Sequence, residues 1–372
     1  MIIDRIETFP LFHKLREPYG DANGWKAYRT CYLFRITTRS GLTGWGEAAD
    51  WLPVLDRGFQ ERIIPFLTGK RADERTVLVE TVGNWNKRAA AGVSLALTEI
   101  AAKGAGLSVS GLWGGARRSR LPVYASLQSY RPGEDWEKRS LEQVERVLQA
   151  GYRQLKIKIG GKPACEDRQH VRAVQSLSGG NVPLILDANQ SYDAAAVKEW
   201  ERHWACWDNL SWLEEPLPLD RAADYRLLRA SLSIPVAGGE NLAGPAKLLP
   251  LLQAEAFDIS QPDPLHSGGI DAYREMLSLS RLYGKRVSPH TYDGSLSRLY
   301  ALTAQACLEP WSKMENENIE PVEWDVMDNP FSRLFPLEPV DGFVSLPQGA
   351  GIGLEPDEEI LRHYRWDGSI YS

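Results

Sequence analysis

The chain has 372 residues, of which 43% are hydrophobic and 25% charged, with a net charge of -6. These values and the absence of a basic cluster argue against a polyanion-binding surface, so we expect no nucleic-acid partner. No apolar run approaches the roughly 18 residues of a membrane helix, and the start, MIIDRIETFP, lacks the layout of a signal peptide, so we expect no membrane association. The four cysteines (31, 165, 206 and 307) form no CxxC pair, which favours reduced thiols and a cytoplasmic location.

The first third of the chain has an α+β pattern. Residues 31–40 and 41–51 alternate like antiparallel strands, with a turn at Ser40 and Gly41. Residues 75–85 and 91–106 then show helical periodicity. We therefore expect a first α+β domain over residues 1–120.

From Leu121 the pattern changes to short apolar runs, each followed by a long amphipathic stretch. The runs are LPVYASLQSY, QLKIKIGG, VPLILDANQ, LSWLEEP, IPVAGGE, FDISQPD and KRVSPH. Strands that alternate with helices form parallel βα units, and seven or eight units over about 200 residues are typical of a (β/α)8 barrel. The sequence therefore predicts an α/β barrel over residues 121–335.

Six chemically active side chains recur at the ends of these runs. They are Lys158, Asp187, Glu214, Glu240, Asp263 and His290, and successive separations are 29, 27, 26, 23 and 27 residues. Each interval is about one βα unit, so a barrel places all six at the carboxyl ends of successive strands, where barrel enzymes have their active sites. A doubly wound sheet would not bring six consecutive strand ends round one centre.

Three of the six are acids, Asp187, Glu214 and Glu240. Three carboxylates that converge at neutral pH repel one another, and a divalent cation removes this repulsion. A set of oxygen ligands without histidine or thiolate favours Mg²⁺ over zinc. The alternative is that the acids are unrelated, each capping a helix or pairing with a surface cation.

Two lysines lie on one face of the predicted strand LKIK, because side chains alternate along a strand. Burial and like charge lower the pKa of a lysine, so we expect Lys158 to act as a base while Lys156 stays charged and holds an anionic substrate. Alternatively, both lysines cap the strand and pair with nearby acids.

His290 and Asp263 follow adjacent predicted strands, close enough for the carboxylate to orient the imidazole and raise its basicity. No serine or cysteine stands in a nucleophile setting, so a hydrolase triad is not indicated. Of the other histidines, 13, 170, 203, 266 and 363, only His266 is expected near the rim.

The motifs KIKIGG, LILDANQ, WLEEPLP, PVAGGEN, DISQPD and SPHTYDGSL, in this order, resemble the mandelate racemase group of the enolase superfamily. The resemblance extends to GLTGWGEAADW in the first domain and to VDGFVSLPQGAGIGLEPDEEIL near the end. It implies a (β/α)7β barrel covered by the first domain as a cap, with residues 336–372 returning to that cap. It also suggests a homo-oligomer.

The resemblance further implies roles for individual residues. Mg²⁺ would bind Asp187, Glu214 and Glu240, with Glu215 outside the ligand set. Lys158, assisted by Lys156, would be one acid/base and the pair of His290 and Asp263 the other, while Asn189 would touch the substrate. The shared step would be removal of the proton alpha to a carboxylate.

Two features favour an acid-sugar dehydratase. The stretch DPLHSGG after Asp263 has no lysine, unlike muconate cycloisomerases and dipeptide epimerases, whose activities are therefore disfavoured. The polar segment 13–30, expected as a specificity loop with Arg16, Tyr19 and Lys26 among its candidate contacts, suits a hydroxylated acid. It could also be a solvated loop without substrate contact, and a racemase or epimerase of a hydroxy acid is the second prediction.

The resemblance also implies a glutamate on the eighth strand, for which Glu315, Glu317, Glu320 and Glu323 are candidates. Spacing favours Glu315, which follows His290 by 25 residues. Two other classes stay open, a Schiff-base aldolase that uses Lys158 and a non-catalytic binding protein.

Overall fold

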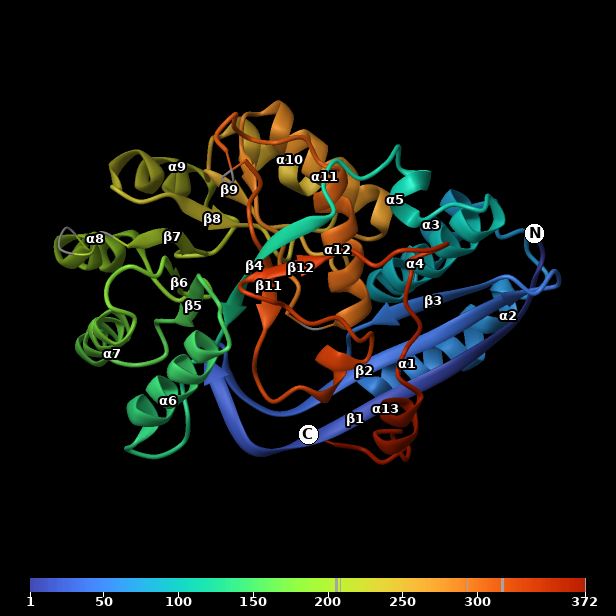
Figure 1. The fold of residues 1–372 in the computed structure, drawn as a ribbon, viewed down its shortest axis with the longest axis horizontal. Coiled ribbons are helices and arrows are strands. Elements are labelled where there is room, and N and C mark those ends of the chain that lie inside the picture. Colours follow the sequence, from blue (N-terminus) through green and yellow to red (C-terminus); the bar gives the residue numbers. More distant parts are fainter. Residues whose placement is uncertain (205–206, 208, 293, 316–317, 372) are drawn as a thin grey trace.

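The computed structural model describes residues 1–371 except 205–206, 208, 293 and 316–317. It consists of a barrel and a cap, and the first two strands run along one side of the molecule to the barrel (Figure 1). Cys206 and Glu317 lie outside the described residues, and Cys31, Cys165 and Cys307 form no disulfide with one another. None of the described helices combines the length and apolar character that crossing a bilayer requires.

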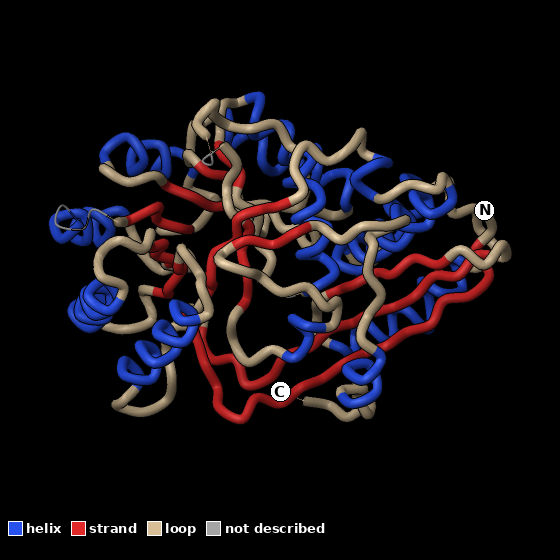
Figure 2. The backbone as a smooth tube through the Cα atoms, in the orientation of Figure 1, coloured by secondary structure: helices blue, strands red, loops and turns tan. Residues whose placement is uncertain are grey.

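The cap contains a three-stranded antiparallel sheet of β1 (Ile3–Asp21), β2 (Gly24–Thr38) and β3 (Thr43–Ala48) (Figure 2). Helix α4 (Lys87–Gly104) packs directly on β3. A Cβ at Gly44 would lie 2.1 Å from the Ala96 carbonyl oxygen, and one at Gly46 would lie 2.5 Å from the Gly92 oxygen. The glycines of TGWG therefore permit a helix–strand approach that a larger residue would prevent.

The remaining helices of the cap surround this pair. They are α1 (Leu52–Gly58), the π-helix η1 (Phe59–Ile63), α2 (Ile64–Leu67), α3 (Arg75–Gly83) and α5 (Val109–Leu112). Asn86 begins α4, since its side chain accepts hydrogen bonds from the backbone N–H groups of Arg88 and Ala89.

Eight parallel strands and seven intervening helices form the barrel in the described part of the chain. The strands are β4 (Arg120–Ser126), β5 (Leu155–Lys158), β6 (Leu184–Asp187), β7 (Leu210–Glu214), β8 (Val236–Gly238), β9 (Ile259–Ser260), β10 (Arg286–Val287) and β11 (Val322–Asp325). The helices are α6 (Trp136–Gln149), α7 (Ala164–Leu177), α8 (Ala194–Trp204), α9 (Ala222–Ser231), α10 (Pro245–Gln253), α11 (Ile270–Leu282) and α12 (Ser295–Cys307). The predicted (β/α)7β architecture is confirmed.

The barrel closes between its last two strands just beyond β10. The Glu323 N–H donates to the Pro289 oxygen at 3.3 Å, and the Thr291 hydroxyl donates to the Glu323 oxygen at 2.6 Å. This closure brings the end of β11 next to the segment that carries His290.

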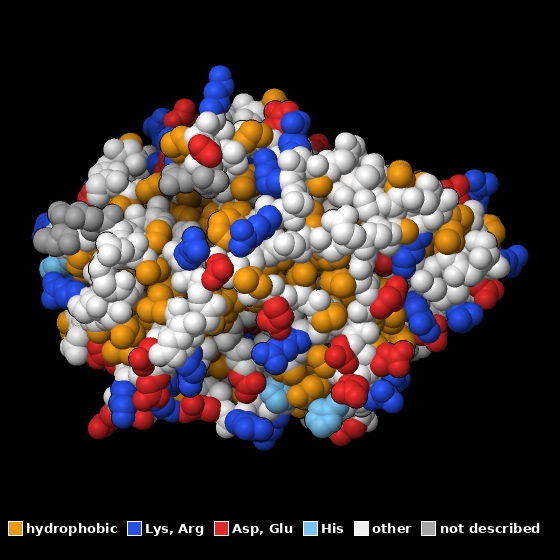
Figure 3. Space-filling model, viewed as in Figure 1, with side chains coloured by type: hydrophobic (Ala, Val, Ile, Leu, Met, Phe, Trp, Pro, Cys, Tyr) orange, Lys and Arg blue, Asp and Glu red, His pale blue; other side chains and the backbone are white. Residues whose placement is uncertain are grey.

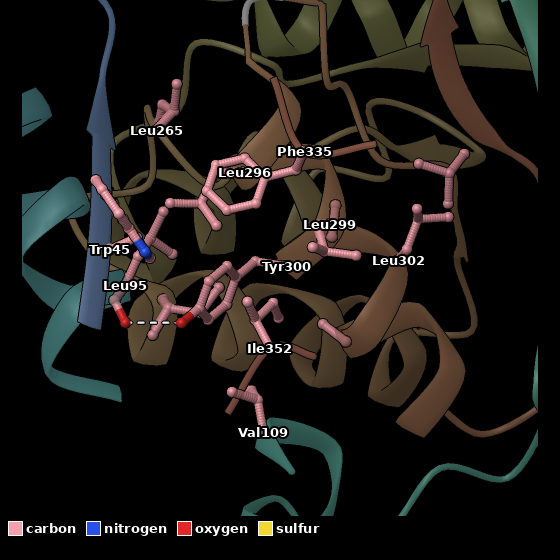
Figure 4. Packing of buried hydrophobic residues seen from close by; sticks show 14 of the residues in the cluster. Trp45, Leu95, Val109, Leu265, Leu296, Leu299, Tyr300, Leu302, Phe335 and Ile352 are labelled. Carbon is pink, nitrogen blue, oxygen red and sulfur yellow. Dashed lines mark hydrogen bonds between the residues drawn. The ribbon is translucent and has the colours of Figure 1, made fainter. Parts of the chain in front are cut away.

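Cap and barrel share a hydrophobic core around α12 (Figure 4). The Tyr300 hydroxyl donates to the Leu95 carbonyl of α4 at 2.7 Å, so the polar end of a buried ring is satisfied across the domain boundary. Nearby, the buried Glu47 carboxylate of β3 accepts the Ser297 N–H at the start of α12 at 2.8 Å. The two domains are thus joined by buried contacts.

The end of the chain passes back over both domains. After the 3-10 helix η2 (Pro330–Arg333), β12 (Phe343–Ser345) pairs antiparallel with β4, and α13 (Glu358–His363) follows. The Phe12 N–H of β1 donates to the Tyr364 oxygen at 2.8 Å. On the face in Figure 3, acidic and basic side chains are interspersed.

The predicted loop over residues 13–30 is wrong. These residues form the ends of β1 and β2, joined by a turn at Ala22 and Asn23, with an irregular register between Lys14 and Tyr19. The hairpin continues because its backbone groups pair across the two strands instead of remaining solvated. Its tip, which we call the hairpin tip (residues 19–29), reaches the carboxyl end of β4 through a bridge between Gly20 and Tyr130.

Candidate active site

Strand register sets the centre of the site. Lys158, Asp187 and Glu214 are cross-strand partners at the carboxyl ends of β5, β6 and β7. Parallel pairing therefore places an amine and two carboxylates side by side on the barrel rim. All three are at least 95% buried.

Lys156, one pleat deeper, is fully buried and lies between three carboxylates. Its Nζ is 2.6 Å from Glu214 Oε1, 2.7 Å from Glu323 Oε1 and 3.5 Å from Asp187 Oδ2. Burial alone would lower the pKa of Lys156, but these carboxylates raise it well above its usual value. Lys156 is therefore a fixed positive charge.

Lys158 forms an ion pair with Asp187. Burial and Lys156 lower the pKa of Lys158, as expected from the sequence, but the Asp187 carboxylate outweighs both and the pKa is raised. The predicted lowering is therefore wrong for this arrangement. Burial opposes the effect of the lysines on Asp187, but they still lower its pKa to about 2.

Two neutral donors hold the other oxygen of Glu214. Its Oε2 accepts the Gln261 amide at 2.7 Å and the Trp212 indole N–H at 3.2 Å. Burial nevertheless raises the pKa of Glu214 to about 7, since the attraction of Lys156 offsets only part of this effect. The carboxylate is held in place, while its charge is not fully compensated.

Glu240 lies just beyond β8, on the side of the rim where His290 lies. Its Oε2 is 3.3 Å from His290 Nε2, and His266 Nδ1 lies 3.0 Å from its backbone oxygen. Burial and the negative charge of Glu240 raise the pKa of neighbouring Glu215 to about 8. The neutral form of Glu215 is therefore favoured beside Glu240.

The donor chemistry of Asp187, Glu214 and Glu240, three carboxylates at successive strand ends, fits a hard divalent cation. Within the described residues, no three histidine, cysteine or acidic side chains are arranged to hold a metal as they stand. The reason is that Lys156 and Lys158 pair with Glu214 and Asp187, while Glu240 turns towards His290.

His290 and Asp263 form the expected pair, with Nδ1 2.6 Å from Asp263 Oδ2. Burial lowers the pKa of His290, but Glu240, Glu323 and Asp263 together raise it well above its usual value. These carboxylates therefore favour the imidazolium form of His290, which can donate a proton. It contacts Glu240 and Glu323, whereas Lys158 contacts Asp187.

The acid of the eighth strand that faces the site is Glu323. It lies within β11, contacts Lys156 and accepts the Thr291 N–H at 3.0 Å. Glu315 is exposed in the segment between α12 and β11, which enters the strand at its amino end, on the opposite side of the barrel. Glu320, at the same end, pairs with Arg281. The placement of Glu315 in the site is therefore wrong.

The hairpin tip covers the rim. Asp21 pairs with Lys26 at 2.7 Å and is close enough to Lys158 to raise its pKa. Arg29 pairs with Asp325 at the end of β11 at 2.8 Å and donates to the backbone oxygen of Tyr292 at 3.0 Å. The sequence did not indicate this link, because no spacing relates residue 29 to residue 325.

The three predicted contacts on this segment differ in position. Tyr19 is buried at the hairpin tip, and Lys26 lies 5.2 Å from the centre of the Tyr292 ring. Arg16 is exposed. Only Tyr19 and Lys26 therefore lie with the groups that cover the rim.

Some of the unpaired buried polar atoms lie at or just after the ends of the barrel strands. Buried side-chain atoms without a hydrogen-bond partner in the described structure include Ser126 Oγ, Gln128 Oε1, Asn189 Oδ1 and Gln261 Oε1. Asn189, which the sequence indicated as a substrate contact, also has a left-handed backbone with φ of 42°. Buried polar atoms normally have partners, so these atoms point to a polar ligand at the rim.

Two sequence families match the two parts of the chain. The N-terminal domain of the mandelate racemase / muconate lactonizing enzyme family matches residues 7–114, and the family described as enolase C-terminal domain-like matches residues 139–360. Together these matches cover the cap and most of the barrel.

Individual relatives extend over the whole chain. D-galactarolactone cycloisomerase of Agrobacterium fabrum is 30% identical, over 98% of this chain and 99% of the relative. The crystal structure of 3,6-anhydro-D-galactonate cycloisomerase from Zobellia galactanivorans has a TM-score of 0.84 at 25% identity and covers 99% of this chain and 100% of that one. L-talarate/galactarate dehydratase from Salmonella typhimurium, liganded with Mg and L-lyxarohydroxamate, shares the fold with a TM-score of 0.83 at 23% identity, over 98% and 93% of the two chains.

Proposed function

Because the chain belongs to the mandelate racemase / muconate lactonizing enzyme family of the enolase superfamily, we propose that it eliminates a β-oxygen from a sugar acid, in the simplest case by Mg²⁺-dependent dehydration to a 2-keto-3-deoxy acid. The observation that carries this choice is the set of unpaired polar atoms at the rim, Ser126 Oγ, Gln128 Oε1, Asn189 Oδ1 and Gln261 Oε1. A polyhydroxylated acid would satisfy them, whereas an aromatic acid would leave them unpaired.

The proposed acid and base come from opposite sides of the rim. Lys158 would accept the proton alpha to the substrate carboxylate, and His290 would donate a proton to the departing β-oxygen. The charged state of His290 supports the second role, since Glu240, Glu323 and Asp263 all favour the imidazolium. Asp263 would keep the ring oriented through its 2.6 Å contact with Nδ1.

We propose Asp187, Glu214 and Glu240 as the residues that hold Mg²⁺, because they are the acids at the ends of three successive strands. When bound, Mg²⁺ would compensate the negative charge of Asp187 and stabilise the negative charge that develops on the substrate carboxylate. Asp187 would then no longer hold Lys158 in its charged form, so the neutral amine of Lys158 could accept a proton. Lys156 would remain on Glu323 and keep a positive charge beside the substrate.

A second candidate differs only in the leaving oxygen. If that oxygen belongs to a lactone or anhydro ring, elimination opens the ring without loss of atoms, which is an isomerisation. The two cycloisomerases among the relatives favour this alternative. A third candidate is racemisation or epimerisation, in which a proton returns to the opposite face of the same carbon, and the separate positions of Lys158 and His290 allow it.

Mass and proton exchange distinguish these reactions. The full-length protein with Mg²⁺ is incubated in D₂O with a panel of linear and cyclic sugar acids, and products are followed by NMR and mass spectrometry. Dehydration gives a 2-keto acid that has lost water, ring opening gives a 2-keto acid of unchanged formula, and epimerisation gives no keto group. Absence of both a 2-keto product and α-proton exchange throughout the panel would overturn the proposal.

A further inference from the structure

Arg131 lies in the segment after β4, where the hairpin tip docks on the barrel. Gly20 and Tyr130 exchange two backbone hydrogen bonds, of 3.0 and 3.2 Å. This antiparallel bridge sets Tyr19 opposite Arg131, and the guanidinium carbon lies 5.5 Å from the centre of the Tyr19 ring. Arg131 is thus enclosed between the barrel and its cover.

The direction of Arg131 follows from its neighbours. The Tyr130 hydroxyl donates to Asp167 Oδ1 of α7 at 2.8 Å, so this side chain points outward to the helix layer. Side chains alternate along extended backbone, so Ser129 and Arg131 point the other way. Ser129 Oγ indeed accepts the backbone N–H of Lys158 at 2.8 Å, so this side faces strand β5. Arg131 therefore points away from the helix layer, on the side where the Tyr19 ring of the hairpin tip lies.

Arg131 differs from the two cations of the hairpin tip. Lys26 pairs with Asp21, and Arg29 pairs with Asp325. Arg131 is 93% buried, yet within the described residues its Nη1 donates only to the backbone oxygens of Gln128 and Tyr130, and no carboxylate of these residues lies within 4.0 Å of it. A buried charge without a counter-ion is costly, so a site of this kind favours an anionic ligand.

We propose that Arg131 binds a second carboxylate, at the far end of the substrate from the reacting carbon. The planar fork of a guanidinium matches a carboxylate, and the Tyr19 ring lies beside the Arg131 guanidinium. The substrate class is then the sugar diacids rather than the sugar monoacids. This inference rests on the proposed function, whose site it extends.

Matched acids test the proposal. Galactarate and galactonate, and likewise glucarate and gluconate, differ only in whether the far carbon is a carboxylate or a hydroxymethyl group. The full-length parent and the Arg131→Met, Arg131→Lys and Arg16→Met variants are compared by kcat/KM for 2-keto acid formation, and calorimetry measures binding of each acid. Arg16→Met is the matched control, because Arg16 is exposed on the same hairpin.

In the pair of acids that the parent turns over faster, we expect a higher kcat/KM for the diacid than for the monoacid. Arg131→Met should lower kcat/KM for that diacid by about 10- to 100-fold, mainly through KM, with little change for the monoacid. Arg131→Lys keeps the charge but loses the fork, so an intermediate loss is expected, and Arg16→Met should match the parent. Equal loss for both acids in Arg131→Met, or a parent that favours the monoacid, would overturn the proposal. A fall in kcat/KM in Arg131→Met for a 6-phosphorylated monoacid but not for a diacid would also overturn the proposal.

Calorimetry separates this inference from the proposed function. If no acid yields product or exchange but Arg131→Met still weakens diacid binding relative to monoacid binding, the reaction is wrong and the binding site stands. If products form but binding of both acids is unaffected by Arg131→Met, the reaction stands and the site is wrong. Thermal unfolding of each variant shows whether a loss of activity or binding is caused instead by a less stable folded state.

Discussion

The rim of β5–β7 and the hairpin tip both contribute charged groups to the candidate site, but they hold them differently. On the rim, Lys156, Asp187 and Glu214 are fixed by parallel strand register and contact one another within the barrel. At the hairpin tip, Asp21 and Arg29 are held by one turn and a few contacts across the domain boundary. We infer from this difference that the proposed reaction chemistry belongs to the barrel, while the hairpin tip covers it.

The largest effects are expected for the proposed base, Lys158, and the proposed acid, His290, which lie on opposite sides of the rim. In Lys158→Ala we expect α-proton exchange and elimination to fall together by about 10²- to 10⁴-fold, because both need the base. In His290→Asn we expect elimination to fall while exchange persists, because the leaving oxygen loses its proton donor. NMR in D₂O measures both rates on one sample.

Lys138→Ala is the control for this pair, since Lys138 is exposed on α6. Exchange at the parent rate in Lys158→Ala would contradict its role as the base. Loss of exchange confined to His290→Asn would reverse the two assignments.

The link between the hairpin tip and the barrel is tested by Asp325→Asn. Removing one partner of a buried ion pair costs about 3–5 kcal/mol in the free energy of unfolding. We expect the lower end, because Arg29 keeps its 3.0 Å hydrogen bond to the Tyr292 oxygen. Urea unfolding measures the loss.

The exposed pair of Arg117 and Glu309 gives the matched comparison. Glu309→Gln should change the free energy of unfolding by less than about 1 kcal/mol, because solvent screens that pair. If the two variants lose the same stability, the buried link does not hold the hairpin as described.

On the barrel side, acid should destabilise the protein through His170. This side chain is buried between α6 and α7, with Nε2 2.9 Å from Ser140 Oγ, and burial lowers its pKa to about 4. The unfolded chain, with a histidine pKa near 6.5, then binds a proton that the folded chain does not, so stability falls as pH drops from about 6.5 to about 4. The full effect is about 3 kcal/mol.

Urea unfolding at several pH values, for the parent and His170→Gln, measures this contribution. The difference in unfolding free energy between the two proteins should shrink as pH falls. A constant difference across this range would show that the buried imidazole does not titrate as described.

The smallest effect concerns the cap. Asn86 caps α4 by accepting the N–H groups of Arg88 and Ala89, both at 2.9 Å. Asn86→Ala should cost about 1 kcal/mol in the free energy of unfolding, and Asn86→Ser should restore most of it. Equal losses in the two variants would show that capping is not the cause.

The sequence predicted the barrel side of the site far better than the cap side. A period of one βα unit places Lys158, Asp187 and Glu214 on neighbouring strand ends, and the structure has them in register. Glu315 was preferred to Glu323 because the segment between α12 and β11 is long, so counting from His290 ended before the strand began. Spacing is informative only where the connections are regular.

Contacts across the domain boundary could not be read from periodicity. The turn residues Asp21 to Gly24 between alternating stretches could have indicated a hairpin. No local pattern, however, pairs Arg29 with Asp325 or Tyr19 with Arg131. The pKa of Lys158 was likewise missed, because its sign depends on whether Asp187 lies within pairing distance.

The central claim is that Asp187, Glu214 and Glu240 hold a cation without which Lys158 stays paired and cannot act as a base. The most direct measurement is 2-keto acid formation by the parent protein from its best sugar acid after chelation with EDTA and after addition of Mg²⁺. Chelation should abolish formation and Mg²⁺ should restore it. Formation at the same rate in both conditions would contradict the account.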